Sequence, residues 1–483
     1  MHDLRRQALE SGKTISRKAL SREGSRSGSR LSSARNSRPN SRQTSRQSSR
    51  AASRYASEDE DNGSLSDGTS FSTTSFDDLD NPEADNYDWP TELAERIQEL
   101  LDRKRSSVQG REEALAAYCR LSKYHYVEEQ IRSHIQDLLG ALSKSIKHES
   151  SVRETTLALK ALELMAVTAN DDRIYDAVEP LLTRTIRDSK SMVVKAAAIH
   201  CLGTCTYFGG TGEEGKLDQM NFFLDIVASD GHSIDAPDDA GAVTAALQQW
   251  GFLATDIEDL AGESEEAVES FIEQLESSEP RVQIAAGENI ALLYEKSYTP
   301  REDDDEDEAS SGEDSDADSD DDQHLVKRYD AYHDTRQLER LLQSLATVSG
   351  KHISKRDRKT LHTNFSSILT TVENPRRGPM YNKAIDQDTN RQYGSKRRVR
   401  IGRDAVMNVD RWWKWIRLAS LRRILQGGFL EHYYQGNRAV LNSLPMILQE
   451  ERPVVTDRAA AKKAAKYRNS MRRMVLEEED MWE

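Results

Sequence analysis

The chain has 483 residues, of which 36% are hydrophobic and 31% are charged, and its formal net charge is −16. This length allows one to three domains with a sizeable core, but so low a hydrophobic fraction predicts that substantial parts stay disordered. Three cysteines are too few for a disulfide framework, which indicates a reducing compartment, and no apolar run reaches the roughly 18 residues of a membrane span.

Charge is concentrated in blocks of opposite sign. Residues 1–54 contain 14 Lys or Arg against 3 Asp or Glu, whereas residues 302–322 contain 14 Asp or Glu. Residues 396–473 contain 19 Lys or Arg against 6 Asp or Glu. Basic segments near both ends of an acidic body favour a polyanionic partner that is bound by the ends. No membrane partner is expected, and the expected compartment is the cytoplasm, with the nucleus as a second compartment.

Residues 1–86 are predicted to be a disordered arm. A Ser-Arg pair recurs between Ser25 and Arg54, mostly every four residues, and such a composition cannot bury a core. The same spacing puts Arg42 three residues before Ser45, an arrangement that basophilic kinases read. The arm is therefore either a kinase substrate or a passive solubilising tail.

Residues 87–350 are predicted to form a helical-repeat domain, because apolar residues recur there at intervals of three and four. Pairs of small residues also recur, at steps of 39, 42, 48 and 40 residues. These pairs are Ala116-Ala117, Thr155-Thr156, Ala197-Ala198, Ala245-Ala246 and Ala285-Ala286. This is the period of HEAT and armadillo repeats, which stack into a solenoid and usually offer a concave surface to a protein partner. The predicted fold class is an all-α solenoid, and an irregular helical bundle is the alternative.

The run 300–323 is predicted to interrupt this domain as an acidic loop. Its alternating Asp residues lack the turn glycine of an EF-hand, and Leu325 stands where the last ligand of that motif belongs, so a solvated linker is expected. Acidophilic kinases recognise an acid three residues after a serine. The serines of the loop with this spacing are Ser310, Ser311, Ser315 and Ser319.

Signals for catalysis or for a cofactor are weak. Gly210–Lys216 has the spacing of a phosphate-binding loop, but Leu217 follows where Ser or Thr should hold magnesium, and two glutamates lie inside the segment. Cys201 and Cys205 lie one helical turn apart, but a metal site needs three or four converging ligands, so buried thiols are expected. We therefore expect no enzyme activity, no cofactor and no metal.

Residues 351–452 are predicted to form a small helical module. A helix is expected over 354–372, followed by irregular structure over 376–395. Trp412 and Trp415 would share a helix face with Leu418 and pack, whereas Trp413 would either pack or stack on a base. Basic residues around them form either a phosphate-binding surface or a solvated face, and the cluster at 396–400 also fits a nuclear signal. The candidate residues are Lys396, Arg397, Arg398, Arg400, Arg411, Trp413, Lys414, Arg417, Arg422 and Arg423.

Residues 453–483 are predicted to form a basic helix that begins after Asp457, a residue suited to cap it. Alanines at 459–461, 464 and 465 favour helix, and the segment has little apolar surface with which to dock as core. A slim basic helix suits a channel lined with RNA phosphate, and a frayed, solvated tail is the alternative. Its candidate phosphate contacts are Lys462, Lys463, Lys466, Arg468, Arg472 and Arg473.

The C-terminal third contains an ordered series of motifs. Ser354–Lys359 leads into Phe365–Leu369, and Val399–Gly402 precedes Val409–Trp415 and Leu425–Tyr433. This series resembles the interferon-related developmental regulator family, and residues 91–350 are similar to its repeat domain. The resemblance implies a non-enzymatic regulator with one of two roles. One role is binding ribosomes, with a C-terminal helix entering the path of tRNA and mRNA, and the other is nuclear co-regulation of transcription.

We therefore expect a regulator that binds the ribosome or rRNA through its basic C-terminal region and modulates translation. A transcriptional co-regulator that acts through the helical-repeat surface is the alternative. Protein partners on the solenoid and kinases acting on both serine clusters are further expected partners.

Overall fold

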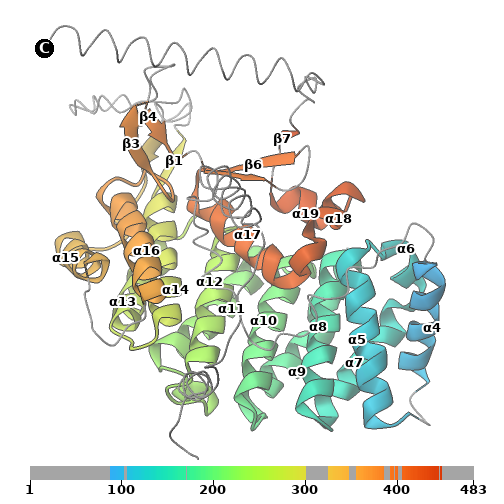
Figure 1. Ribbon diagram of the computed structural model, residues 1–483. Coiled ribbons are helices and arrows are strands. Elements are labelled where there is room, and N and C mark those ends of the chain that lie inside the picture. The colour runs from blue at the N-terminus through green and yellow to red at the C-terminus, as the bar shows by residue number, and fades with distance from the viewer. Residues whose placement is uncertain are drawn as a thin grey trace, which may run out of the picture. The chain divides into compact units, whose positions relative to one another are not determined.

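The computed structural model describes residues 88–102, 106–169, 171–300, 325–347, 355–385, 392–395, 397–400, 405–444 and 447–448. The predicted arm at 1–86, the acidic loop and the predicted basic helix at 453–483 lie outside the described residues, apart from Pro300 at the start of the loop. Within the described part, helices predominate and the strands are short, so the fold class is the predicted all-α solenoid (Figure 1).

The solenoid is built from helix pairs, each with a first, outer helix and a second, inner helix. The outer helices are α4 (Trp89–Leu101), α7 (Ile135–His148), α9 (Ile174–Asp188), α11 (Glu213–Ala228), α13 (Ala261–Leu275) and α15 (Thr335–Ala346). The inner helices are α5 (Val108–Tyr124), α8 (Val152–Ala169), α10 (Met192–Phe208), α12 (Ala240–Ala254), α14 (Pro280–Lys296) and α16 (Lys355–Glu373). Short helical turns join some of them, namely α6 (Glu128–Ile131), η2 (Arg132–His134) and η3 (His232–Ile234). Each inner helix packs against the inner helix of the next pair, so the inner helices form one continuous layer.

The periodic small residues mark this inner layer. All five predicted pairs of small residues lie on inner helices, and Ala198, Ala246 and Ala286 are fully buried. Glycines add to the close approach of the helices. A Cβ on Gly203 of α10 would lie 2.3 Å from the Gln249 amide oxygen of α12. The period in the sequence thus reports where neighbouring inner helices touch, as repeat stacking requires.

Local sequence explains where many of the helices begin. Ser107 accepts a hydrogen bond from the Gly110 backbone N–H at 3.0 Å, and Asp239 accepts one from the Ala242 N–H at 2.8 Å. Both side chains satisfy a backbone donor that the first turn leaves free. Pro280 is the first residue of α14, where its missing N–H costs nothing.

The pair α15–α16 continues the solenoid beyond the acidic loop. α16 packs against α14 as the next inner helix, so the boundary that we expected at residue 350 falls between the two helices of this pair. The helix expected over 354–372 is α16, and its Leu361, Phe365 and Ile368 are buried.

Strands appear where the sequence suggested only loop or helix. β1 (Tyr298–Pro300) and β2 (Leu325–Lys327) pair in antiparallel fashion at the base of the acidic loop. β3 (Asn382–Ile385) pairs with β4 (Gln392–Gly394), so the expectation of irregular structure over 376–395 is corrected there. β5 (Arg397–Arg400), β6 (Ala405–Val409) and β7 (Ile447–Leu448) form a third sheet. The C-terminal module is therefore not purely helical. These strands span two to five residues, too few for an alternating pattern to stand out.

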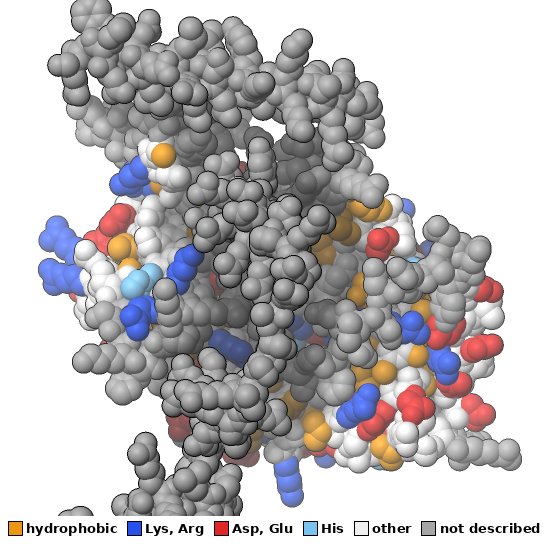
Figure 2. Space-filling view, viewed as in Figure 1, with side chains coloured by type: hydrophobic (Ala, Val, Ile, Leu, Met, Phe, Trp, Pro, Cys, Tyr) orange, Lys and Arg blue, Asp and Glu red, His pale blue; other side chains and the backbone are white. Residues whose placement is uncertain are grey.

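The rest of the module is helical and consists of α17 (Trp412–Leu425), η5 (Gln426–Gly428), α18 (Phe429–Tyr434) and α19 (Arg438–Ser443). None of the helices in the described ranges combines the length and apolar character that a bilayer crossing requires. Figure 2 shows acidic and basic side chains mixed over the described surface at the N-terminal end of the repeats.

Candidate functional site

Helix α17 of the C-terminal module lies across the inner layer of the solenoid (Figure 1). It contacts α14, α12, α8 and α5, so it runs back along the repeats in the reverse of chain order. Its buried side chains are Trp412, Trp415, Ile416, Leu418, Ser420, Leu421, Ile424 and Leu425. The packing predicted for Trp412 and Trp415 is confirmed. The apolar ones among these side chains share one core cluster with the repeats, so the face that such solenoids usually offer to a partner is covered by the chain itself.

A glutamate of the repeats caps the start of α17. The Glu295 carboxylate accepts hydrogen bonds from the backbone N–H groups of Trp412 at 2.7 Å and Trp413 at 3.1 Å. It does for α17 what an N-cap side chain does locally, and its negative charge suits the positive end of the helix. Burial raises the pKa of Glu295 to about 7, although Arg411 and these N–H groups oppose the rise.

A second glutamate of α14, Glu288, accepts a hydrogen bond from the side chain of Trp415. Trp415 Nε1 donates to Glu288 Oε1 at 3.0 Å, and Trp412 Nε1 donates to Thr371 Oγ1 of α16 at 2.8 Å. Burial raises the pKa of Glu288 to about 7 as well. Both indole N–H groups are thereby satisfied inside the interface, as buried tryptophans require.

The middle of α17 is held by Arg417. Its Nε donates to Thr255 Oγ1 at 2.9 Å, and its Nη2 donates to the Thr255 carbonyl at 2.9 Å and to Asp256 Oδ1 at 3.1 Å. The other Asp256 oxygen pairs with Lys216 Nζ at 2.6 Å. The guanidinium also lies 5.0 Å from the Trp413 ring centroid and 5.6 Å from that of Tyr207. Arg417 is thus committed to the repeats through both charge and aromatic contacts.

The end of α17 is held by a buried charge cluster. Arg423 Nη1 donates to Glu163 Oε1 at 2.6 Å, and its Nη2 donates to Thr204 Oγ1 at 3.0 Å. Lys160 Nζ donates to the other Glu163 oxygen at 3.0 Å and to the Arg423 carbonyl at 3.0 Å. Burial alone would raise the pKa of Glu163, but the charges of Arg423 and Lys160 outweigh it and hold the pKa at about 2. Nearby His200 is buried, and burial together with Arg423 lowers its pKa well below the ordinary value.

The turn from α17 into α18 requires glycine. A Cβ on Gly428 would lie 1.7 Å from the Lys123 carbonyl oxygen of α5. Only glycine lets the two backbones come this close, which gives a physical reason for Gly428 in the sequence motif.

Buried polar side chains fix the segment from α18 to α19 to helices α5 and α8. Asn437 Nδ2 donates to the Val167 carbonyl of α8 at 3.2 Å and lies 3.0 Å from His432 Nδ1. His432 Nε2 then carries the proton that it donates to the Ser122 carbonyl of α5 at 3.0 Å. Burial lowers the pKa of His432 to about 4, so this imidazole is neutral near pH 7.

Several of the predicted phosphate-binding residues lie together on and next to α17, where most of them contact other parts of the protein. Arg417 and Arg423 bind the repeats, Lys414 pairs with Asp410 at 2.6 Å, and Arg411 Nη1 donates to the Arg376 carbonyl at 3.4 Å. Arg422 is partly buried on the same helix. Trp413 is partly buried, with Lys414 Nζ 5.4 Å from its ring centroid.

The remaining candidates lie in or beyond the small sheet. Arg397, Arg398 and Arg400 form β5, where their Cα partners are Val409, Asn408 and Val406 of β6. Lys396 lies outside the described residues. So do the candidates of the basic helix, namely Lys462, Lys463, Lys466, Arg468, Arg472 and Arg473.

The sequence did not single out the carboxylates that receive α17. Glu163, Asp256, Glu288 and Glu295 come from three separate stretches of the repeats. The sequence held a signal for one of them: Glu163 is the only charged residue in the second half of α8, where a charge without a partner would be costly.

The apparent phosphate-binding loop is a connection between repeats. Gly210 turns with a φ of 91°, and α11 begins three residues later at Glu213. Lys216 is the partner of Asp256. Cys119, Cys201 and Cys205 are buried free thiols, and burial raises the pKa of Cys119 to about 12.

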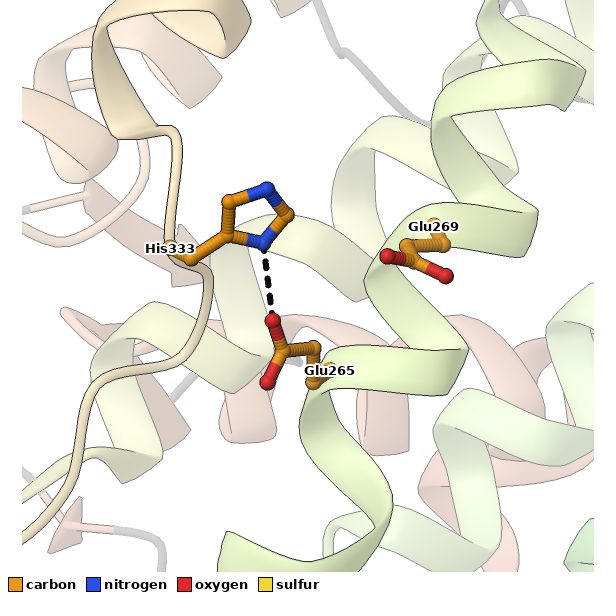
Figure 3. Close-up of side chains that lie close together, drawn as sticks. All are labelled: Glu265, Glu269 and His333. Atoms are coloured by element: carbon orange, nitrogen blue, oxygen red, sulfur yellow. Dashed lines mark hydrogen bonds and ion pairs between the residues drawn. The ribbon is translucent and has the colours of Figure 1, made fainter.

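Two glutamates of α13 and a histidine meet on the surface (Figure 3). His333, from the segment before α15, lies with Nδ1 2.7 Å from Glu265 Oε1, and Glu269 follows one turn later. All three are well exposed, and a hydrogen-bonded His–Glu pair at the surface accounts for this geometry.

Comparison with known proteins connects this architecture to a family. A family model described as interferon-related developmental regulator matches residues 57–373, well over half of the chain. The chain belongs to the interferon-related developmental regulator family. The resemblance seen in the sequence is confirmed. The family match ends at the last residue of α16, so it includes the sixth helix pair and stops before α17.

Individual proteins similar to this chain share about a quarter of the aligned residues with it. An uncharacterized protein of Schizosaccharomyces pombe is 28% identical over 71% of this chain and 72% of its own length. Interferon-related developmental regulator 2 of Mus musculus is 24% identical over 68% of this chain and 66% of its own length. Among solved structures, an engineered protein is 13% identical with a TM-score of 0.32, covering 57% of this chain and 97% of its own. A designed armadillo repeat protein is 15% identical with a TM-score of 0.31, covering 58% and 99%.

Proposed function

We propose that this interferon-related developmental regulator is a non-enzymatic protein that binds ribosomes or RNA through its basic C-terminal region and modulates translation. One observation carries the proposal: the inner face of the solenoid is filled by α17, so the repeats act as a base that holds the C-terminal module. Basic residues are concentrated in this module and in the segment that follows it. Polyanion binding by such residues is dominated by phosphate contacts.

The docking of α17 narrows the set of phosphate contacts. Arg417 and Arg423 are bound to carboxylates of the repeats, so they position the module rather than contact RNA. Lys414 and Arg411 are engaged within the module as well, by Asp410 and by the Arg376 carbonyl. The binding residues of the proposal are therefore Lys396, Arg397, Arg398, Arg400 and Arg422 together with the basic residues at 462–473. A protein partner of the solenoid would bind the outer helices or their edges, because α17 covers the inner face.

Sedimentation tests this function. The tagged full-length chain is run through a sucrose gradient with and without RNase, and co-migration with ribosomal particles is expected, with binding that weakens steeply as salt rises. A chain without residues 457–483, and one in which the four basic residues at 396–400 become Ala, should each bind less. The control changes Arg173 and Arg184 to Ala, because they are exposed cations at the outer helix α9, with exposed side-chain fractions of 75% and 74%.

The outcomes separate the candidate functions. Both C-terminal variants should keep the thermal midpoint of the wild type, because the buried contacts of α17 described above are made by other residues. A full-length chain that stays at the top of the gradient or moves with chromatin contradicts the proposal and supports the transcriptional alternative. Equal loss of binding in the α9 control would show that only net charge matters.

A further inference from the structure

The C-terminal module presents a pair of aromatic rings at its surface. Tyr434, the last residue of α18, is 52% exposed. The ring of Tyr433 meets it edge-on, with 5.6 Å between the ring centroids. Tyr434 is the only aromatic side chain among the exposed large hydrophobic residues of the described part of the chain. An aromatic ring half in water, backed by a second ring, offers a flat apolar face together with a polar hydroxyl tip.

The backbone under these rings is fixed. The next residue, Gln435, accepts a hydrogen bond through Oε1 from the Tyr126 backbone N–H at 2.6 Å. Gly436 then turns the chain with a φ of 79°, a conformation that glycine adopts without strain. On either side, His432 and Asn437 bind carbonyls of α5 and α8. A ring attached to a backbone that is already fixed loses little conformational entropy when it makes a contact.

Basic residues belong to the same module as the pair. Arg438, exposed at the first turn of α19, follows Tyr434 by four residues. The chain then runs from α19 into β7, which pairs with β6, and β6 pairs with the basic strand β5. Figure 1 shows α18, α19, β6 and β7 on the same side of the repeats.

Trp413, the aromatic residue that the sequence offered for base stacking, is less suited to it. Its ring is partly buried and already has the Arg417 guanidinium at 5.0 Å and Lys414 Nζ at 5.4 Å from its centroid. A base would have to displace one of these cations, whereas Tyr434 faces solvent.

We propose that Tyr434, backed by Tyr433, is a stacking platform for an unpaired base of single-stranded RNA, and that Arg438 contacts a neighbouring phosphate. Stacking on an aromatic face accepts any base, while the arginine supplies the charge attraction. The inference deepens the proposed function and rests on it, since it names the form of nucleic acid that the module takes.

The test compares substitutions of one side chain in the full-length protein. A labelled single-stranded RNA of about 12 nucleotides is the probe, and its affinity is measured by fluorescence anisotropy. Tyr434→Ala should weaken binding on the order of ten-fold or more, whereas Tyr434→Phe, which keeps the ring, should bind like the wild type. Val193→Ala is the control, because Val193 is 61% exposed on α10, outside the module. Binding of duplex RNA should not respond to Tyr434→Ala, since paired bases do not offer a free face.

Three other results would overturn the inference, and they differ in what they say about the proposed function. Equal affinity of Tyr434→Ala and wild type for the single-stranded probe overturns the inference while leaving the proposed function standing. The inference is also overturned if Tyr434→Ala no longer co-sediments with ribosomes but binds the single-stranded probe as tightly as the wild type, because Tyr434 would then contact a ribosomal protein. A wild-type chain that binds neither RNA nor ribosomes overturns the proposed function and this inference with it.

Discussion

Glu163 holds the two cations that fasten the end of α17. Its side chain is 4% exposed and receives Arg423 and Lys160 on its two oxygens. The carboxylate therefore belongs to a buried cluster in which each charge depends on the others, and removing one partner leaves the rest uncompensated.

Glu163→Gln is accordingly expected to lower the free energy of unfolding by about 3–5 kcal/mol near neutral pH. Urea unfolding at several pH values measures it. Because the pKa of Glu163 in the fold is about 2, below the ordinary value of 4.5, its stabilisation is present above pH 4.5 and is lost as the pH falls toward 2. The deficit of the variant should shrink over the same range.

The exposed pair between Arg184 and Asp188 serves as the control, with exposed side-chain fractions of 74% and 64%. Asp188→Asn should change the free energy of unfolding by less than about 0.5 kcal/mol. Equal effects of the two substitutions would contradict the buried cluster.

The pKa of Glu288 is shifted in the opposite direction to that of Glu163. Burial raises its pKa to about 7, with Trp415 Nε1 as the hydrogen-bond donor that opposes the rise. The folded state therefore binds a proton more tightly than the unfolded state, so the group lowers stability as the pH rises from 4.5 through 7.

Glu288→Gln should therefore stabilise the protein by about 3 kcal/mol near pH 8 and by less than about 1 kcal/mol near pH 5. An amide is neutral at both values, and its oxygen can still accept the Trp415 hydrogen bond. Thermal unfolding at the two pH values gives the comparison. A variant that is less stable than wild type at the higher pH would show that the charge is compensated by a group that these contacts do not include.

At the scale of elements, the inner helices depend on glycines where they touch. Gly203 of α10 faces Gln249 of α12, whose side chain is fully buried and whose Nε2 lies 3.0 Å from His200 Nδ1. Gln249 therefore cannot swing aside to make room for a methyl group.

Gly203→Ala should lower the free energy of unfolding by about 1–3 kcal/mol through overpacking. Gly140→Ala is the matched control, since Gly140 is exposed on the outer helix α7 and its added Cβ would meet nothing within 4 Å. There the usual helix preference should apply and raise stability by about 0.5–1 kcal/mol. Urea unfolding measures both variants. If Gly203→Ala raises the free energy of unfolding as Gly140→Ala does, the close contact of α10 and α12 is contradicted.

At the scale of the whole molecule, α17 is part of the core rather than an appendage. Its apolar residues belong to the cluster that runs through the repeats, and its polar contacts reach α8, α10 and α14. The stability of the repeats and that of the module should therefore be coupled.

Leu421→Ala tests this coupling, because Leu421 is fully buried in α17. It should cost about 2–5 kcal/mol, like a core truncation in any domain, and it should speed amide hydrogen exchange in α8 as well as in α17. Leu441→Ala is the control within the module, since Leu441 is 38% exposed on α19 and should change stability by less than about 1 kcal/mol. Faster exchange confined to α17 would mean that the module opens independently of the repeats.

The sequence by itself determined the repeats and the family. The spacing of small residue pairs reflects contacts between helices that are neighbours in the chain, so a one-dimensional period records them. Helix starts at Ser107, Asp239 and Pro280 follow from capping chemistry that acts within one turn. The C-terminal motifs carried the family resemblance for the same reason, since each is a short stretch that can be read locally.

Only the tertiary structure decided what the basic face of α17 does. In the sequence, Arg417 and Arg423 were indistinguishable from phosphate contacts, because helical spacing tells which residues share a face but not what that face meets. Their partners, Thr255 and Glu163, lie 162 and 260 residues away along the chain. Electrostatic attraction and burial act through space, so the same arginines that look like RNA contacts in one dimension bind the repeats once the chain folds back on itself.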